Sequence, residues 1–194
     1  MFGDKFYKRL DKLEPWQQTV FALALAERMY PNYQLYSESS GQGSAQVFRH
    51  ALDTLWQYLT ERGSRLDLSA ELEALEEHIP EPVKEGHYGA YPALDACVAL
   101  SCAYNSVVCR IGEEATEASH ASVGSVAGFL EMLAGEELSD DVLYEQPLMN
   151  EELEFQVNLL NQVSRPRDAN EIGAIRQLAA QDGVSNLGIT LSGD

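Results

Sequence analysis

One stretch of the chain, residues 92–110, is nearly free of formal charge, and this constrains the fold more than any other feature. Between Glu85 and Arg110, the one formally charged side chain is Asp95. A helix that is apolar nearly all round belongs in the middle of a globule or in a membrane. The stretch therefore predicts a central apolar helix from Pro92 to Arg110, with other helices packed around it.

The start of this helix gives Asp95 two possible roles. Pro92 suits the first helical position, where the missing N–H costs no hydrogen bond. Asp95 then falls in or just after the first turn, where a carboxylate interacts favourably with the helix dipole. At about 100° per residue, Asp95 shares one side of the helix with Cys102, Asn105 and Ser106. We interpret this row of polar residues as structural and expect Asp95→Asn to be less stable than wild type. A functional role of the Asp95 carboxylate is the alternative.

The same polar side chains argue against membrane insertion. Asp95, Ser101, Asn105 and Ser106 are costly in lipid. The basic flanks that orient a membrane span are also missing, because Glu85 and His87 lie before the stretch and Glu113 and Glu114 follow Arg110. We therefore expect no membrane partner.

The cysteines and the amino terminus predict the compartment. All three cysteines fall on the predicted central helix. Cys102 and Cys109 face the same way but lie about 10 Å apart at 1.5 Å rise per residue, too far for a disulfide. Cys97 points elsewhere. The amino terminus has no apolar signal segment. We expect reduced core thiols and a cytoplasmic protein.

In the rest of the chain, residues typical of helix starts and helix ends recur. No sustained alternation of apolar and polar residues indicates a β-strand. Pro31 and Asn32 are predicted to close the second helix, followed by a short helical turn. We expect an irregular stretch over residues 80–89 and an extended tail over residues 186–191. The predicted helices cover residues 5–12, 15–30, 44–62, 69–79, 113–133, 147–163 and 169–181, with a short helix from Ser139. The prediction is one all-α domain over residues 1–194, a compact helical bundle.

The charge of the chain is strongly acidic. Thirty-one Asp and Glu residues oppose 13 Lys and Arg residues, which gives a formal net charge of −18. Such a surface repels a phosphate backbone, so we expect no nucleic-acid partner. A basic protein partner is one explanation of the acidic charge. The explanation we favour is solubility, because the acidic residues are spread along helix faces.

No catalytic or metal-ligand motif is complete. Glu117 and His120 have the spacing found in helical di-iron sites, which need two such pairs and two further glutamates. The other histidines complete no ligand set. Gly41, Gly43 and Ser44 precede a helix, but the third glycine of a dinucleotide loop and the lysine of a P-loop are absent. We predict no catalytic residue, no metal and no cofactor.

Polar residues near the predicted end of the second helix are candidates for a binding pocket. A Glu–Arg pair is followed there by Asn and Tyr in a turn. The candidate pocket comprises Glu27, Arg28, Asn32, Tyr33, Tyr88, Tyr91 and Asp95. Alternatively, Arg28 caps helix carbonyls, Asn32 makes the turn and the tyrosines pack with satisfied hydroxyls, which is the interpretation we favour.

Several runs of residues resemble the signature of one family. The most specific are Glu-Arg-Met-Tyr-Pro-Asn-Tyr at 27–33 and Tyr-Pro-Ala-Leu-Asp-Ala-Cys at 91–97, and Ser-Asn-Leu-Gly-Ile at 185–189 agrees with them. Over residues 8–189 the chain resembles the YjaG-like family of uncharacterised bacterial proteins (domain of unknown function family 416). The resemblance implies a compact helical fold and no established activity, and it supplies no catalytic residues.

Two functions follow from these observations. The first is a protein-binding or self-assembling module without catalytic activity, whose partner is another protein or a second copy of the chain. The alternative is a small-molecule binder or unrecognised enzyme with a polar pocket near Arg28, Tyr91 and Asp95. A clustered exposed apolar patch supports the first. A concave pocket that holds Asp95 with a perturbed pKa supports the second.

Overall fold

Residues 2–61 and 66–190 are the part of the chain that the computed structural model describes, and they form helices without any β-strand. The all-α prediction is therefore confirmed. The helices are α1 (Asp4–Leu10), α2 (Pro15–Ser40), α3 (Ala45–Thr60), α4 (Leu68–Glu76), α5 (Pro82–Glu85), α6 (Ala90–Val108), α7 (Glu114–Ala134), α8 (Asp140–Tyr144), α9 (Pro147–Val163) and α10 (Ala169–Ala180), followed by a 3-10 turn η1 (Gln181–Gly183).

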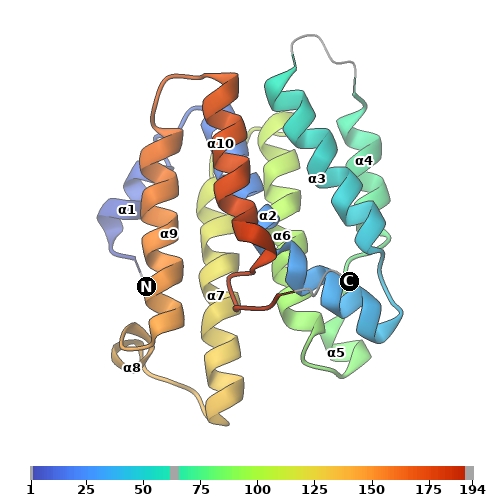
Figure 1. The fold of residues 1–194 in the computed structure, drawn as a ribbon, viewed down its shortest axis with the longest axis vertical. Coiled ribbons are helices and arrows are strands. Elements are labelled where there is room, and N and C mark those ends of the chain that lie inside the picture. Colours follow the sequence, from blue (N-terminus) through green and yellow to red (C-terminus); the bar gives the residue numbers. More distant parts are fainter. Residues whose placement is uncertain (1, 62–65, 191–194) are drawn as a thin grey trace.

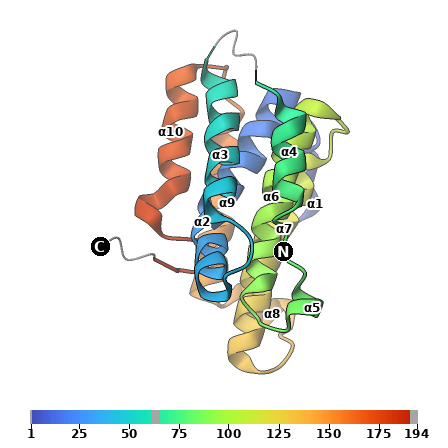
Figure 2. The same ribbon diagram turned by 90° about the vertical axis from the view of Figure 1, so that its right-hand side faces the viewer.

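Two long helices, α2 and α6, form the centre of the bundle (Figure 1). The apolar helix predicted around residues 92–110 is α6. Helix α2 is equally central, because every residue from Gln18 to Met29 is buried. Figure 2 shows α2 between α10 on one side and α6 and α7 on the other.

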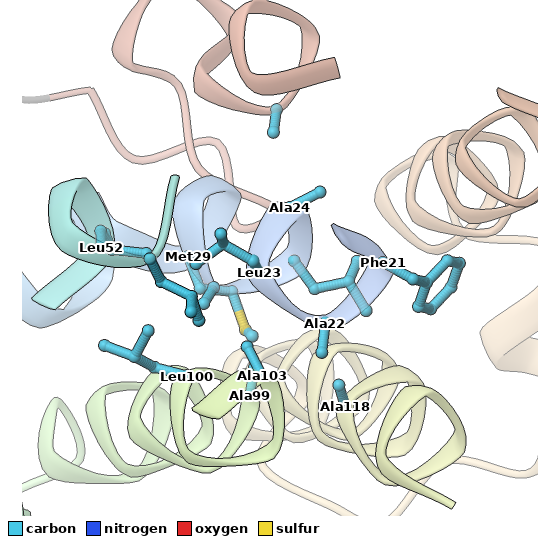
Figure 3. Close-up of a cluster of buried hydrophobic side chains, with 14 of the residues drawn as sticks. Phe21, Ala22, Leu23, Ala24, Met29, Leu52, Ala99, Leu100, Ala103 and Ala118 are labelled. Carbon is cyan, nitrogen blue, oxygen red and sulfur yellow. The ribbon is translucent and has the colours of Figure 1, made fainter. Parts of the chain in front are cut away.

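Small side chains allow α2, α6 and α7 to approach closely. Ala22 of α2 and Ala99 and Ala103 of α6 are fully buried, as is Ala118 of α7. In Figure 3, Ala22 points toward the helices that carry Ala99, Ala103 and Ala118. Leu23, Met29, Leu52 and Leu100 fill the space beside this contact. Interiors packed in this way leave little room for added methyl groups.

The prediction that Pro31 and Asn32 end the second helix is wrong. Helix α2 continues through Pro31 and ends at Ser40, and the following Gly41 has the left-handed φ of +68°. An internal proline removes one backbone hydrogen bond and costs about 3 kcal/mol or more. Tyr33 and Tyr36, which follow the proline, are buried in the core. Burying each large side chain contributes about 1.5–3 kcal/mol, which offsets the cost.

Helix α6 starts earlier than Pro92 alone suggests. It begins at Ala90, so Pro92 is its third residue and Asp95 lies two positions deeper than predicted. The backbone N–H of Ala93 donates to the Gly89 carbonyl at 3.4 Å. Pro92 therefore still falls among the first residues of the helix, whose N–H groups need no helical acceptor.

The carboxy-terminal segment folds back rather than extending away. Val184 and Thr190 form an isolated antiparallel bridge, and the Ser185 N–H donates to the Ile189 carbonyl at 2.9 Å. The last predicted tail residue, 191, lies outside the described residues, as does the predicted helix end at residue 62. Leu187 enters a second, smaller core with Val123, Val126, Leu143 and Met149. The predicted irregular stretch 80–89 contains the short helix α5.

Among the described residues, no helix is both long enough and apolar enough to cross a bilayer.

The close contact between α2 and α6 predicts a large effect from one added side chain. We expect Ala99→Leu to lower the free energy of unfolding by about 1–3 kcal/mol, because the site is fully buried and has no space for three more carbons. Urea denaturation measures this. The control is Ala70→Leu on the exposed side of α4, where we expect a change within about 0.5 kcal/mol. Equal effects from the two substitutions would contradict the packing described above.

Candidate binding site

The neighbouring residues Glu27 and Arg28 point to different sides of α2, because consecutive helical residues are separated by about 100°. Glu27 is buried against α3. Its two carboxylate oxygens accept hydrogen bonds from Arg49 at 2.6 and 2.8 Å, and Trp56 Nε1 donates to Glu27 Oε2 at 2.8 Å. Arg176 of α10 approaches the same carboxylate at 3.9 Å. This group therefore ties α2 to α3 and α10.

Arg28 faces α9 and forms a buried ion pair with Glu152. Arg28 Nε lies 3.1 Å from Glu152 Oε2, and both side chains are almost inaccessible to solvent. The guanidinium also donates to the Gln181 side chain and lies 4.3 Å from the centre of the Phe155 ring. Arg28 is therefore neither a helix-end cap, because α2 continues past it, nor a partner of Asp95.

The Glu152 carboxylate is held by further hydrogen bonds inside the bundle. Ser122 Oγ donates to Glu152 Oε1 at 2.6 Å, and Gln156 Nε2 donates to the same oxygen at 2.7 Å. Ser119 Oγ donates to Gln156 Oε1 at 2.6 Å. A buried ion pair with its hydrogen bonds satisfied is destabilising to break, because either partner alone is an uncompensated charge. This network is structural.

Asn32 connects α2 to the carboxy-terminal segment. Its Nδ2 donates to Asn186 Oδ1 at 2.8 Å, and Asn186 Nδ2 donates to the Ser122 carbonyl at 3.3 Å. The Asn32 side-chain oxygen is buried and has no hydrogen-bond partner in the described part of the chain. Buried polar atoms are nearly always paired, so this oxygen is an exception and has an acceptor site left over.

A hollow of about 270 Å³ lies beside Asn32. It is formed by the second half of α2, the turn before α6, the start of α6, the end of α7 and the carboxy-terminal segment. Its lining residues are Asn32, Leu35, Tyr36, Ser39, His87, Tyr88, Gly89, Pro92, Phe129, Leu187 and Ile189. Of the seven predicted pocket residues, Asn32 and Tyr88 are brought together here. We call this feature the α2–α7 hollow.

The remaining predicted residues lie elsewhere. The Tyr33 hydroxyl donates to the His78 carbonyl at 2.8 Å and accepts the Ser44 N–H at 3.1 Å, so it belongs to the core. Burial raises the pKa of Tyr33 to about 12. Tyr91 is 50% exposed and lies outside the hollow.

Asp95 lies close to the hollow without lining it. Burial raises the pKa of the Asp95 carboxyl from 3.8 to about 6, and the facing Ser125 hydroxyl lowers it in part. Burial and the nearby Asp95 charge raise the pKa of Tyr88 to about 12. No Lys, Arg or His among the described residues lies within 4.0 Å of this carboxyl. Asp95 is therefore a half-buried acid without a cationic partner.

Two lining residues, Tyr36 and His87, were absent from the predicted pocket. Their rings stack with centroids 5.6 Å apart, and His87 Nε2 lies 3.6 Å from Glu85 Oε2. Burial, followed by the Glu85 carboxyl, raises the pKa of the Tyr36 hydroxyl. Tyr36 was missed because the helix that carries it was predicted to end at Pro31. Extending the helical periodicity past the proline is the signal that would have found it.

The residues that were considered as metal ligands are dispersed. Across residues 2–61 and 66–190, no three His, Cys, Asp or Glu side chains gather in a metal-binding arrangement. His120 packs its ring against Tyr7, with centroids 4.7 Å apart. Cys97, Cys102 and Cys109 are all free thiols, but Cys109 is exposed, so the prediction of three core thiols is wrong for it. Helix α6 ends just before Cys109, which places this side chain outside the bundle.

The fold and the site define an all-helical protein with a small hollow next to its central helix. A family model described as "Protein of unknown function (DUF416)" matches residues 5–190, and the chain belongs to this family. The family resemblance seen in the sequence is thereby confirmed.

Relatives and a solved structure agree with this assignment. The chain is 37% identical to "Uncharacterized protein YjaG" of Escherichia coli (strain K12), covering 97% of this chain and 98% of that protein. It is 33% identical to an "Uncharacterized protein" of Haemophilus influenzae, covering 94% and 95%. The crystal structure of a DUF416 family protein from Shewanella baltica OS155 matches with a TM-score of 0.88 and 34% identity, covering 98% of this chain and 100% of that chain. None of these descriptions names a reaction or a ligand.

The raised pKa of Asp95 predicts how stability depends on pH. Because the folded-state pKa of about 6 lies above 3.8, folding favours the protonated carboxyl. This contribution to stability is fully present below pH 3.8 and is lost as the pH rises to about 6. This replaces the expectation drawn from the sequence alone, which was a less stable variant: we expect Asp95→Asn to be more stable than wild type at pH 8. The expected gain is about 1–2 kcal/mol, less than the full effect of the pKa shift, because solvent reaches part of the side chain.

Thermal denaturation between pH 4 and pH 8 checks this expectation. The difference between Asp95→Asn and wild type should grow as the pH rises through about 6. The control is Asp141→Asn, at an exposed position of α8, for which we expect no such trend. A less stable Asn variant at pH 8 would restore the interpretation of Asp95 as a helix-start carboxylate.

Proposed function

We propose that the protein binds a small, mainly apolar molecule in the α2–α7 hollow. The observation that carries this proposal is that three runs responsible for the family resemblance meet there. Asn32 comes from the run 27–33, Pro92 from the run 91–97, and Leu187 and Ile189 from the run 185–189. These runs are far apart in the sequence, so their convergence on one hollow supports a shared role for them.

The lining favours an apolar ligand body with one hydrogen-bond donor. Leu35, Pro92, Phe129, Leu187 and Ile189 provide aliphatic and aromatic surface. The unpaired Asn32 oxygen is an acceptor for a ligand N–H or O–H group. Small-molecule sites combine such apolar walls with few polar groups, in volumes of roughly 300–1,000 Å³. At about 270 Å³, this hollow is just below that range and suits a small ligand.

The proposal is for binding without a reaction. The acid with the perturbed pKa, Asp95, does not line the hollow. His87 and Tyr36 do line it, but no Ser, Cys or Thr side chain is hydrogen-bonded to His87 in the described residues. The hollow itself and the unpaired Asn32 oxygen, rather than Asp95, support the small-molecule alternative over the protein-binding function that the sequence suggested first. A cytoplasmic location and a single domain also stay part of the proposal.

A second candidate, assembly with another copy of the chain, is favoured by exposed apolar side chains near one end of the bundle. Met132 and Leu133 at the end of α7 and Val142 in α8 are exposed. Val123, Leu143 and Met149 line a separate apolar hollow of about 180 Å³ between α7, α8 and α9. Exposed apolar patches of this kind are typical of interaction surfaces.

Retention of a ligand tests the small-molecule function. We expect protein purified from its native host under non-denaturing conditions to carry a small molecule that mass spectrometry detects after denaturation. Leu35→Trp should remove it, because an indole at this rim position fills the hollow. Val157→Trp on α9 is the matched control, since Val157 is 41% exposed, against 42% for Leu35, and lies outside the hollow. Wild type without any retained molecule, or equal retention by both variants, contradicts the proposal.

Sedimentation velocity tests the assembly function. We expect Leu133→Glu to shift any concentration-dependent dimer toward monomer, because a carboxylate at a 64% exposed apolar position is costly to bury in an interface. The same substitution at Val83, which is 92% exposed on α5, is the control. A wild-type chain that stays monomeric at all concentrations removes this candidate.

A further inference from the structure

A second hollow of about 270 Å³ lies at the other end of α2. It forms where the start of α2, the end of α3, the end of α6 and the connection between α9 and α10 meet, at the same end of the molecule (Figure 1). Its lining residues are Pro15, Trp16, Thr19, Tyr58, Leu59, Ser106, Val107, Arg110 and Arg167, without any Asp or Glu. We call it the arginine hollow, and it shares no lining residue with the α2–α7 hollow.

Two positive charges face this hollow without an acidic partner. The chain has 31 acidic and 13 basic side chains, so carboxylates are plentiful partners for its arginines. Arg28, Arg49 and Arg176 each form an ion pair with one. Within the described residues, Arg110 and Arg167 have no carboxylate within 4.0 Å. Their guanidinium charges are therefore available to an anion.

Backbone carbonyls hold both guanidinium groups beside the hollow. Arg110 Nε donates to the Val107 carbonyl at 3.2 Å, and Arg167 Nη2 donates to the Leu59 carbonyl at 3.2 Å. Each guanidinium has five N–H donors, so most donors of both groups stay free. This arrangement positions two charged, planar donor groups before any ligand arrives.

The backbone of Arg110 is itself unusual. Its φ is +57°, in the left-handed region directly after α6, where glycine is the preferred residue. A non-glycine residue in that conformation is strained, and strain of this kind gathers at functional sites. Arg110 therefore combines a backbone conformation that glycine adopts more easily with a side chain that borders the hollow.

The walls provide aromatic and hydroxyl groups. Arg167 Cζ lies 5.7 Å from the centre of the Trp16 ring, and Tyr58 lines the hollow as well. The hydroxyls of Thr19 and Ser106 lie 2.7 Å apart and are hydrogen-bonded to each other. The nearby Glu14 carboxylate accepts from Trp16 Nε1 at 2.9 Å and from the backbone of α2, so it is occupied and does not line the hollow.

We propose that the arginine hollow binds a phosphomonoester with a small aromatic body. A phosphomonoester carries a charge of about −1.5 to −2 near pH 7, which two guanidinium groups neutralise. Arginine pairs with phosphate through two parallel N–H···O bonds. It pairs with a carboxylate in the same way, so the preference for a phosphomonoester rests on its larger negative charge, which matches two guanidinium groups. The aromatic body packs against Trp16 and Tyr58. The proposal is independent of the ligand in the α2–α7 hollow.

Isothermal titration calorimetry with phenyl phosphate tests this proposal at fixed ionic strength. We expect saturable binding to wild type, weakened about tenfold or more by Arg110→Gly and by Arg167→Gln, because each removes a charge-assisted pair. The control is Arg165→Gln, which removes the same charge two residues from Arg167, at a side chain that pairs with Glu171 outside the hollow. We expect its affinity to match wild type.

The melting temperature of each variant distinguishes loss of the binding site from damage to the fold. Arg110→Gly places glycine where the backbone is left-handed, so we expect its melting temperature to equal or exceed that of wild type while affinity falls. Loss of affinity in that variant is then due to the guanidinium. No binding of phenyl phosphate to wild type, or the same loss of affinity in Arg165→Gln, overturns the proposal.

Two further probes test the chemistry of the ligand. Benzoate keeps the ring and has less charge, and inorganic phosphate has the charge without the ring, so both should bind more weakly than phenyl phosphate. Equal affinity for benzoate would overturn the preference for phosphate, and equal affinity for inorganic phosphate would overturn the aromatic body. Leu35→Trp, which fills the α2–α7 hollow, should leave the affinity for phenyl phosphate unchanged. The two proposals therefore fail independently: loss of phenyl phosphate binding concerns the arginine hollow, and loss of a retained ligand concerns the α2–α7 hollow.

Discussion

The contact between α2 and α6 is the interaction on which the rest of the structure depends. Both helices are buried along much of their length, and the alanines at 22, 99 and 103 let them approach closely. Side chains with only a Cβ cost no rotamer entropy on burial and bring two backbones together. The other helices then cover this pair, with α7 beside it and α3, α9 and α10 around it (Figures 1 and 2). The two hollows lie at opposite ends of α2, where neighbouring helices end and packing is incomplete.

Buried charges fix the rotation of α2 within this arrangement. Glu27 is paired with Arg49 on one side, and Arg28 is paired with Glu152 on another. Turning or sliding α2 by one residue would leave both charges buried without partners, which is strongly unfavourable. The pairs therefore specify one register for the central helix. Asn32, which is about one turn beyond Arg28, is placed against Asn186 by the same register, and this positions the wall of the α2–α7 hollow.

Much of the fold is predictable from the sequence, and much less of the site. The apolar run after residue 90, the helix caps and the absence of strand-type alternation identify an all-α bundle, because these are local properties of the chain. The end of α2 was mispredicted because Pro31 disfavours a helix locally, whereas the burial of Tyr33 and Tyr36 favours it globally. Asn32 and Tyr88 of the candidate pocket do line one hollow, but that pocket also grouped Glu27 with Arg28, and these sequence neighbours lie on different sides of α2.

The sequence by itself determined the helical class, the burial of α6, the acidic surface and the family to which the chain belongs. Only the tertiary structure decided which polar side chains meet. Arg28 and Glu152 are 124 residues apart, and Asn32 and Asn186 are 154 residues apart. Arg110 and Arg167 likewise come together only because α3, α6 and α10 have their ends on one side of the bundle. Periodicity specifies the face on which a residue lies, but the partner of that face depends on how whole helices pack, which is a long-range property.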